Sequence, residues 1–160
     1  MRRLLRAPVA VACAAWLCVV EGHAQPRTVR QRLTPAELDA RDRGGAGAGT
    51  SGVAGIQTTV LHGDPTRAGL YTILLRVPPS TRIEAHVHPD DRVATVISGT
   101  WYFGYGERFD ERELRALPAG SFYTEPPNDP HFARTGPAGA VVEITGYGPT
   151  GTTYVEQAAH

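Results

Sequence analysis

The feature that most constrains the fold is a succession of short segments with two-residue periodicity, rich in β-branched and aromatic residues, that fills the chain after residue 55. This alternation is typical of strands with one buried face. Clusters of Gly, Pro, Asp and Ser separate the segments and predict turns. We therefore expect an all-β domain, a sandwich or a barrel, from nine strands: Ile56–His62, Leu70–Val77, Ile83–His88, Ala94–Ile97, Thr100–Tyr105, Ser121–Glu125, Phe132–Arg134, Ala140–Thr145 and Thr153–Glu156.

Two short helices are expected beside these strands. Thr34-Pro35-Ala36-Glu37 combines a hydroxyl cap, a proline at the first helical position and a glutamate three residues after the cap, which predicts a helix near residues 34–41. Asp110 with Glu113 predicts one or two helical turns inserted between strands, within residues 110–117.

The chain before the strands divides into two parts. Residues 1–24 are typical of a cleaved signal peptide, because arginines precede an apolar stretch that is shorter than the roughly 20 residues of a membrane-spanning helix. This predicts a periplasmic or secreted protein with no membrane attachment after cleavage. Residues 25–54 are expected to hold the first helix and a flexible linker, rich in Gly and Ala over residues 44–52, and residues 55–160 the compact domain.

Composition excludes several kinds of chemistry. The formal net charge is zero and no arginine-rich run occurs beyond the extreme N-terminus, so no nucleic-acid partner is expected. The sequence has no lysine, which rules out Schiff-base catalysis. Cys13 and Cys18 both lie in the signal peptide, so histidines and carboxylates are the strong metal ligands that remain after cleavage.

One histidine pair has the spacing of metal ligands on a strand. His86 and His88 are separated by one residue in a segment that reads as a strand, so their side chains leave the same face of the sheet. A divalent ion between two neutral rings would avoid placing two cations side by side. The alternative is a pair of histidines on an exposed face.

Two motifs resemble those of the cupin family. His86-Val87-His88 followed by Gly99 resembles the first cupin motif, and the segment from Gly120 through Pro126 to His131 resembles the second. The resemblance covers about residues 55–148. It implies a small, single-domain (monocupin) secreted protein with a cupin-type double-stranded β-helix, or jelly-roll barrel. It also implies one divalent metal ion, Fe, Mn, Ni, Cu or Zn, held by His86, His88 and His131.

The sequence departs from these motifs at several positions. Ser80 and Asn128 stand where the family has glycine, and Thr135 where it has a final asparagine; asparagine tolerates the left-handed conformation that glycine usually supplies. Arg92 stands where the family has its metal-binding glutamate, and a guanidinium has no lone pair to give a metal. The ligands are then either three histidines plus water, or three histidines with Asp91 turned inward.

The role of Arg92 has two readings. Pointing inward, it is suited to a bidentate hold on a substrate carboxylate or another anion. Pointing outward, it would be a surface residue paired with Asp90, Asp91 or Glu84.

Other candidate catalytic residues lie on or beside the expected strands. Glu125, like Glu84 and Glu143, could supply an inward carboxylate as a fourth ligand or general base, or could be solvated. Tyr102 and Tyr123 could present a hydroxyl to the site, or could pack in the barrel with the other aromatic residues.

The leading expectation is a metal-dependent enzyme of oxygenase, decarboxylase or isomerase type, most simply dioxygenase-like, acting on a small molecule, which would be anionic if Arg92 binds it. The rival is a non-catalytic exported module that binds or senses a small molecule through the metal, and a third reading is a metal-free barrel. An enzyme needs a proton-transfer group beside the histidines, whereas a binder does not. A homodimer formed through sheet edges is also compatible with the pattern.

Overall fold

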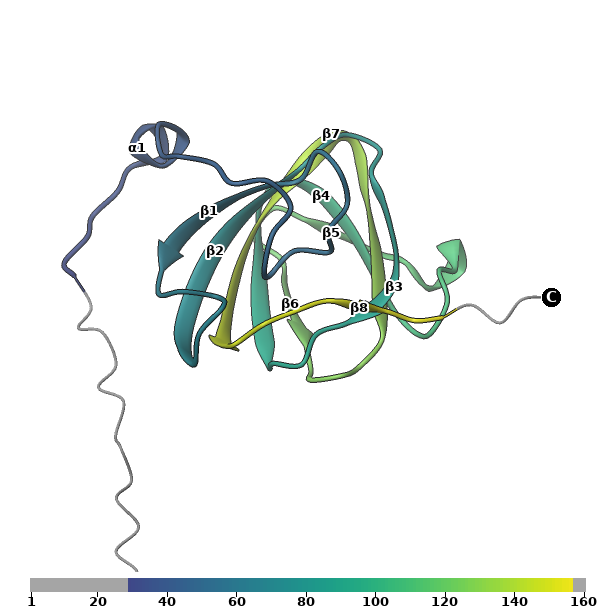
Figure 1. Ribbon diagram of the computed structural model, residues 1–160. Coiled ribbons are helices and arrows are strands. Elements are labelled where there is room, and N and C mark those ends of the chain that lie inside the picture. The colour runs from purple at the N-terminus through teal and green to yellow at the C-terminus, as the bar shows by residue number, and fades with distance from the viewer. Residues whose placement is uncertain (1–28, 157–160) are drawn as a thin grey trace, which may run out of the picture.

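The protein is described by a computed structural model over residues 29–156, in which β-strands dominate (Figure 1). The signal peptide expected over residues 1–24 lies outside the described residues. Among residues 29–156 there is no helix with the length and hydrophobicity of a membrane-spanning segment. The strands are β1 Gln57–His62, β2 Gly69–Val77, β3 Arg82–Val87, β4 Arg92–Tyr105, β5 Arg115–Pro118, β6 Phe122–Glu125, β7 His131–Gly148 and β8 Thr153–Tyr154.

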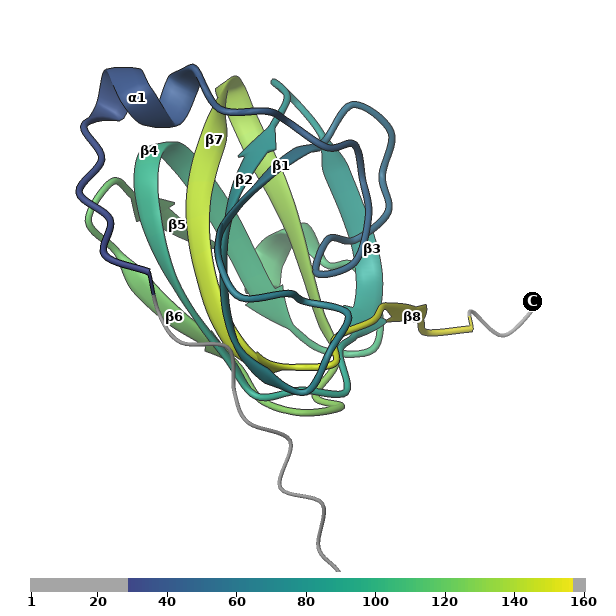
Figure 2. The same cartoon turned by 60° about the vertical axis from the view of Figure 1, so that its left-hand side comes forward.

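The strands pair antiparallel throughout and enclose a single interior. One wall runs β1, β2, β7, and β7 also pairs with β3, which pairs with β8. The longest ladder joins β4 to β7, and β4 also pairs with β5 and β6. Figures 1 and 2 show β7 bending over the barrel so that its two halves lie in different walls. The expected all-β barrel is confirmed.

Alternation along the strands fills the interior with apolar side chains. Tyr71 and Ile73 on β2 and Val96 on β4 are almost fully buried, as are Trp101 and Phe103 farther along β4. Because successive side chains on a strand point to opposite faces, the residues between these lie on the outside of the barrel.

Two expected turns lie inside continuous strands. Ser98-Gly99 falls within β4, where pairing with β7 shifts register on both sides and Gly99 takes a φ of 75°. Residues 136–139 fall within β7, and its pairing with β4 jumps across them from Thr135 to Ala140. The prediction of separate strands on either side was therefore wrong, because glycine here accommodates a bend in a strand and does not end it.

The inserted helix is shorter than expected. A 3-10 turn, η1, spans Glu111–Glu113, and the Asp110 side chain accepts a hydrogen bond from the Arg112 backbone N–H as the cap. The chain then continues as β5, which pairs with β4, so the helical prediction over residues 110–117 was wrong in its second half. Cross-strand pairing replaces helical hydrogen bonds there.

The first helix has the cap that the sequence predicts. Helix α1 spans Pro35–Asp39. The Thr34 hydroxyl accepts from the Glu37 backbone N–H, and the Glu37 carboxylate accepts from the Thr34 backbone N–H at 2.7 Å. This reciprocal pair satisfies donors that a helix N-terminus otherwise leaves free.

The glycine-rich stretch is packed against the barrel and is not a free linker. Gly44 forms a β-bridge with Thr58, and Thr50 and Ser51 are buried. The carbonyl of Thr50 accepts from the Thr152 hydroxyl at 2.5 Å, and that of Ser51 accepts from the Tyr154 hydroxyl at 2.7 Å. The prediction of a flexible linker was wrong, because small residues here let the backbone lie close to the strands and hydrogen-bond to them.

Candidate metal centre

Four strand ends bring the site together at one rim of the barrel. His86 lies near the end of β3 and Glu125 ends β6, whereas Arg92 begins β4 and His131 begins β7. Direct pairing places His86 opposite His131, and Arg92 opposite Glu125. Antiparallel pairing therefore gathers residues that are up to 45 positions apart in the sequence.

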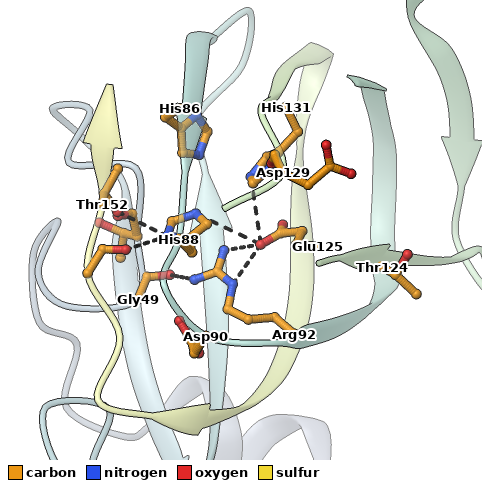
Figure 3. Close-up of polar contacts among 12 residues, drawn as sticks. Gly49, His86, His88, Asp90, Arg92, Thr124, Glu125, Asp129, His131 and Thr152 are labelled. Atoms are coloured by element: carbon orange, nitrogen blue, oxygen red, sulfur yellow. Dashed lines mark hydrogen bonds and ion pairs between the residues drawn. The ribbon is translucent and has the colours of Figure 1, made fainter. Parts of the chain in front are cut away.

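The three histidines of the cupin-like motifs face one another (Figure 3). His86, His88 and His131 are all buried, with their nearest ring nitrogens within 4.8 Å of one another. The ring centroids are separated by 4.5–5.3 Å. Three imidazoles at these separations can hold one metal ion.

Backbone carbonyl groups orient all three rings. The Nδ1 atoms of His86, His88 and His131 lie 2.8, 2.6 and 2.9 Å from the carbonyl oxygens of Glu84, Gly151 and Asp129, respectively. A carbonyl oxygen can only accept, so each Nδ1 carries the hydrogen and each Nε2 is left with a lone pair. This is the arrangement by which outer partners fix the tautomer of metal-ligating histidines.

Burial keeps two of the rings neutral. The pKa of His86 is lowered to about 4, first through burial and then through the neighbouring His131. The pKa of His88 falls to about 3, first through burial and then through the positive charge of Arg92. Both rings therefore have an unprotonated nitrogen at neutral pH, as metal binding requires.

Arg92 and Glu125 form a buried ion pair beside the rings (Figure 3). The Arg92 Nε donates to Glu125 Oε2 at 2.6 Å, and an Arg92 Nη donates to the same oxygen. The other Arg92 Nη donates to the carbonyl of Gly49 at 3.1 Å. The prediction of Arg92 as a surface residue paired with Asp90, Asp91 or Glu84 was therefore wrong. The Arg92 guanidinium is already hydrogen-bonded to Glu125 and Gly49.

The Glu125 carboxylate faces the histidines as well as the guanidinium. Its Oε2 lies 3.9 Å from His88 Nε2 and 3.8 Å from His131 Nε2. Burial alone would raise the pKa of this carboxyl, but Arg92 and the two rings outweigh burial and lower it to about 2. Glu125 is therefore a carboxylate at neutral pH.

A cavity of about 20 Å³ lies between the rings and the barrel core. Four buried polar atoms on residues that line it have no hydrogen-bond partner among the described residues: His88 Nε2, Trp101 Nε1, Tyr123 Oη and Ser51 Oγ. Buried polar atoms are usually paired, so this cluster fits a site that receives an ion or water. The cavity has no room for a substrate.

Tyr123 is one of these lining residues. Burial raises the pKa of its hydroxyl well above the ordinary value, and the charge of Glu125 raises it further. The hydroxyl is thus a neutral proton donor close to Glu125. The sequence-based selection of Tyr123 matches a residue inside the cavity.

Two other candidates lie away from the centre. Asp91 is exposed and is not in the histidine group, so the structure does not place it as a ligand. Tyr102 alternates with the buried Trp101 and Phe103 and faces outward, where its ring lies 3.9 Å below the Arg134 guanidinium. Strand alternation excludes its hydroxyl from the cavity.

Several residues behind the centre carry no recognisable signal in the amino-acid sequence. The Tyr71 hydroxyl donates to Asp90 at 2.7 Å in the interior, and the Asp90 charge acts on Arg92. Gly49 and Gly151 contribute only carbonyl oxygens. Backbone acceptors carry no side-chain pattern, and a single aspartate beside an expected strand resembles a surface residue.

Comparisons with known proteins identify the architecture. No family model matches the chain, and no curated protein matches it. An RmlC-like cupin from Shewanella frigidimarina superposes with a TM-score of 0.51 at 18% identity, covering 68% of this chain and 85% of that one. The DMSP lyase DddQ from Ruegeria pomeroyi gives a TM-score of 0.54 at 17% identity, covering 66% and 54%.

A variant of salicylate 1,2-dioxygenase from Pseudoaminobacter salicylatoxidans, in complex with gentisate, gives a TM-score of 0.52 at 14% identity. It covers 66% of this chain and 30% of that one. At these identities the likeness concerns the fold. The same architecture carries a lyase in one neighbour and a dioxygenase in another, so the fold alone does not select a reaction.

Proposed function

We propose that this chain, which has the cupin fold, is a metal-dependent enzyme in which His86, His88 and His131 hold one divalent transition-metal ion and the substrate is a small molecule. The observation that carries the proposal is the convergence of three buried histidines, in each of which a hydrogen bond from Nδ1 to a carbonyl leaves Nε2 for an ion. Imidazole nitrogens suit iron, manganese, nickel, copper and zinc alike.

The residues around the ion favour an enzyme over a passive binder. A bound ion would supply a Lewis acid that polarises an oxygen of the substrate. The chain adds Tyr123 as a buried hydroxyl that can donate a proton beside the ion. A site that only captured a ligand would not need this group.

The cavity is too small for a substrate, so part of its wall must move to admit one. Because the present space fits only an ion or a water, a substrate needs the wall to move. Gly49 and Ser51 form part of that wall and belong to the glycine-rich segment. We propose that this segment opens to admit the substrate.

The rival function is an exported module that binds a small molecule through the metal without turnover. The expected signal peptide supports an exported location for either function. Tyr123→Phe separates the two: an enzyme that uses the hydroxyl loses turnover and keeps the metal, whereas a binder is unaffected in ligand affinity.

A homodimer remains part of the proposal and is checked by sedimentation.

The test is elemental analysis of the purified protein beside a His131→Ala variant, both shown to be folded by circular dichroism. We expect one divalent ion per wild-type chain and loss of that ion in the variant. Equal metal content in the two proteins, or none in either after incubation with each candidate metal, would contradict the proposal. His62→Ala, which changes a histidine outside the group, is the matched control.

A further inference from the structure

Glu125 on β6 lies opposite Arg92 on β4, the position at which the cupin motif has its metal-binding glutamate. This suggests that the carboxylate ligand of this barrel lies on β6 and not on β4. We infer that Glu125 is a fourth protein ligand of the ion and that Arg92 holds its carboxylate in place. The inference rests on the metal centre proposed above and adds a ligand to it.

The register between β4 and β6 allows a carboxylate on either strand to occupy the same place. Arg92 on β4 and Glu125 on β6 are direct partners in the antiparallel ladder. Side chains of such partners leave the same face, with Cβ atoms about 4.5–5.5 Å apart. A carboxylate on either strand can therefore reach the same centre, and at position 92, where the cupin-like motif would place a glutamate, this chain has an arginine.

The carboxylate is aimed at the histidines. Glu125 Oε2 lies 3.9 and 3.8 Å from the Nε2 atoms of His88 and His131. These are the nitrogens that carry lone pairs, since Nδ1 of each ring donates to a carbonyl. An oxygen and two nitrogens at such separations are spaced as ligands of a common ion, whose bonds are each about 2.0–2.2 Å.

Arg92 has the contacts of a positioning residue. It donates to the same Oε2 that faces the rings, and Gly49 fixes the guanidinium from the other side. Metal-binding carboxylates are commonly held by such a hydrogen bond from outside.

Charge in the interior also favours a cation at this place. Asp90 and Glu125 are both buried carboxylates, whereas Arg92 is the buried cation beside them. Buried charges need compensation because they have lost water. A divalent ion bound by Glu125 would supply positive charge beside these two carboxylates.

The test is a titration of metal-free protein with Co²⁺, followed by its visible spectrum and by calorimetry. In Glu125→Gln we expect Co²⁺ affinity to fall by about 10–100-fold and the ligand-field bands to change, because an oxygen ligand is lost. Glu143→Gln is the matched control: this residue alternates with the buried Val142 and Ile144, so it faces outward, and we expect wild-type affinity and spectrum.

A charge exchange gives a second readout. In Arg92→Glu/Glu125→Arg the carboxylate returns to β4 while the pair is kept, and we expect recovery of most of the affinity lost in Glu125→Gln. If the variants do not fold, the infrared difference between Zn²⁺-bound and metal-free wild-type protein replaces them, since a carboxylate that binds an ion shifts its stretching band.

The outcomes separate this inference from the metal centre itself. Loss of Co²⁺ in His131→Ala with wild-type affinity and spectrum in Glu125→Gln would overturn the inference and leave the three-histidine centre standing. A Zn²⁺ difference spectrum without a carboxylate band would also overturn it. If His131→Ala binds Co²⁺ like the wild type, the metal centre fails and Glu125 has no ion to bind.

Discussion

The three histidines and the Arg92–Glu125 pair occupy the same rim of the barrel but arise from different kinds of sequence information. His86 lies near the end of β3 and His88 directly follows that strand, so a spacing of two residues along an extended segment is enough to bring their rings together. Arg92 and Glu125 are 33 positions apart and meet only because β4 and β6 pair in one particular register. Local spacing is readable in a sequence, whereas cross-strand register is not.

The two regions are also expected to differ in energetics. All three rings are hydrogen-bonded to backbone carbonyl groups, and His86 and His88 are uncharged at neutral pH, so these two lie in the interior at little cost. Arg92 and Glu125 are both charged and buried, so the loss of either one leaves the other as an uncompensated charge in the interior. Removing a member of the pair is therefore expected to affect folding more strongly than removing a ring.

The largest expected effect is that of Arg92→Met in metal-free protein. The change leaves Glu125 buried and unpaired, and we expect a loss of about 3–5 kcal/mol in the free energy of unfolding. Arg82→Met is the control: Arg82 and Glu84 are both about half exposed, and such pairs contribute about 0–1 kcal/mol. Urea denaturation measures both, and similar losses in the two variants would remove the distinction between the regions.

Strand alternation also decides how much of the site the sequence could predict. The motif around His131 and the left-handed turn at Asn128, whose φ is 56°, followed from the sequence. Asp91 was selected as a neighbour of the first motif and Tyr102 as an aromatic residue on an expected strand, but Asp91 is exposed and Tyr102 faces outward. Whether a neighbour of a ligand faces inward depends on where the strand begins, and β4 begins at Arg92.

The fold shows the same division. Capping at Thr34 and most strand positions follow from local patterns. The continuity of β4 through Gly99 and the packing of Thr50 depend on what lies opposite in the folded chain. Glycine in a sequence is usually taken to indicate a turn or a linker, although it also permits a bend within a strand or the close approach of two backbone segments.

A second prediction concerns pH and the histidine region. His86 and His88 are protonated near pH 6.5 in the unfolded chain but only near pH 4 and 3 when folded. Between these values the unfolded chain binds more protons, so the free energy of unfolding of metal-free protein falls as pH falls. We expect a loss on the order of 1 kcal/mol per pH unit for each histidine.

Denaturation at pH 6 and pH 5 measures this slope, and His88→Gln is expected to reduce it by about half. Between these pH values His86 and His88 stay largely unprotonated in the folded chain, so we expect the gain in stability from saturating Zn²⁺ to be similar at both. Stability that is constant or rises as pH falls over this range would contradict the buried, neutral state of the rings.

A third prediction concerns the wall behind the ion pair. A Cβ at Gly146 would lie 2.6 Å from the Tyr71 hydroxyl and 2.7 Å from Asp90 Oδ2. Gly146→Ala is therefore expected to lower the free energy of unfolding by about 1–3 kcal/mol through overpacking. Gly45→Ala, where a Cβ meets nothing within 4 Å, should change it by less than about 0.5 kcal/mol. Equal values would show that the Tyr71–Asp90 contact is loosely packed.

The smallest expected effect is at Tyr102, which the sequence selected and the structure places outside. Tyr102→Phe keeps the ring beneath Arg134 and removes only the hydroxyl. We expect a change within about 0.5 kcal/mol in stability and no change in Co²⁺ affinity. A clear fall in metal affinity, measured by calorimetry, would show that the hydroxyl reaches the site.

The most direct test of the account is a crystal structure of the protein grown with Co²⁺ or Zn²⁺, with anomalous data collected at the edge of that metal. We predict one strong anomalous peak at the rim, about 2.0–2.2 Å from the Nε2 atoms of His86, His88 and His131. A structure with the three rings in place and no peak among them, despite saturating metal, would contradict the account.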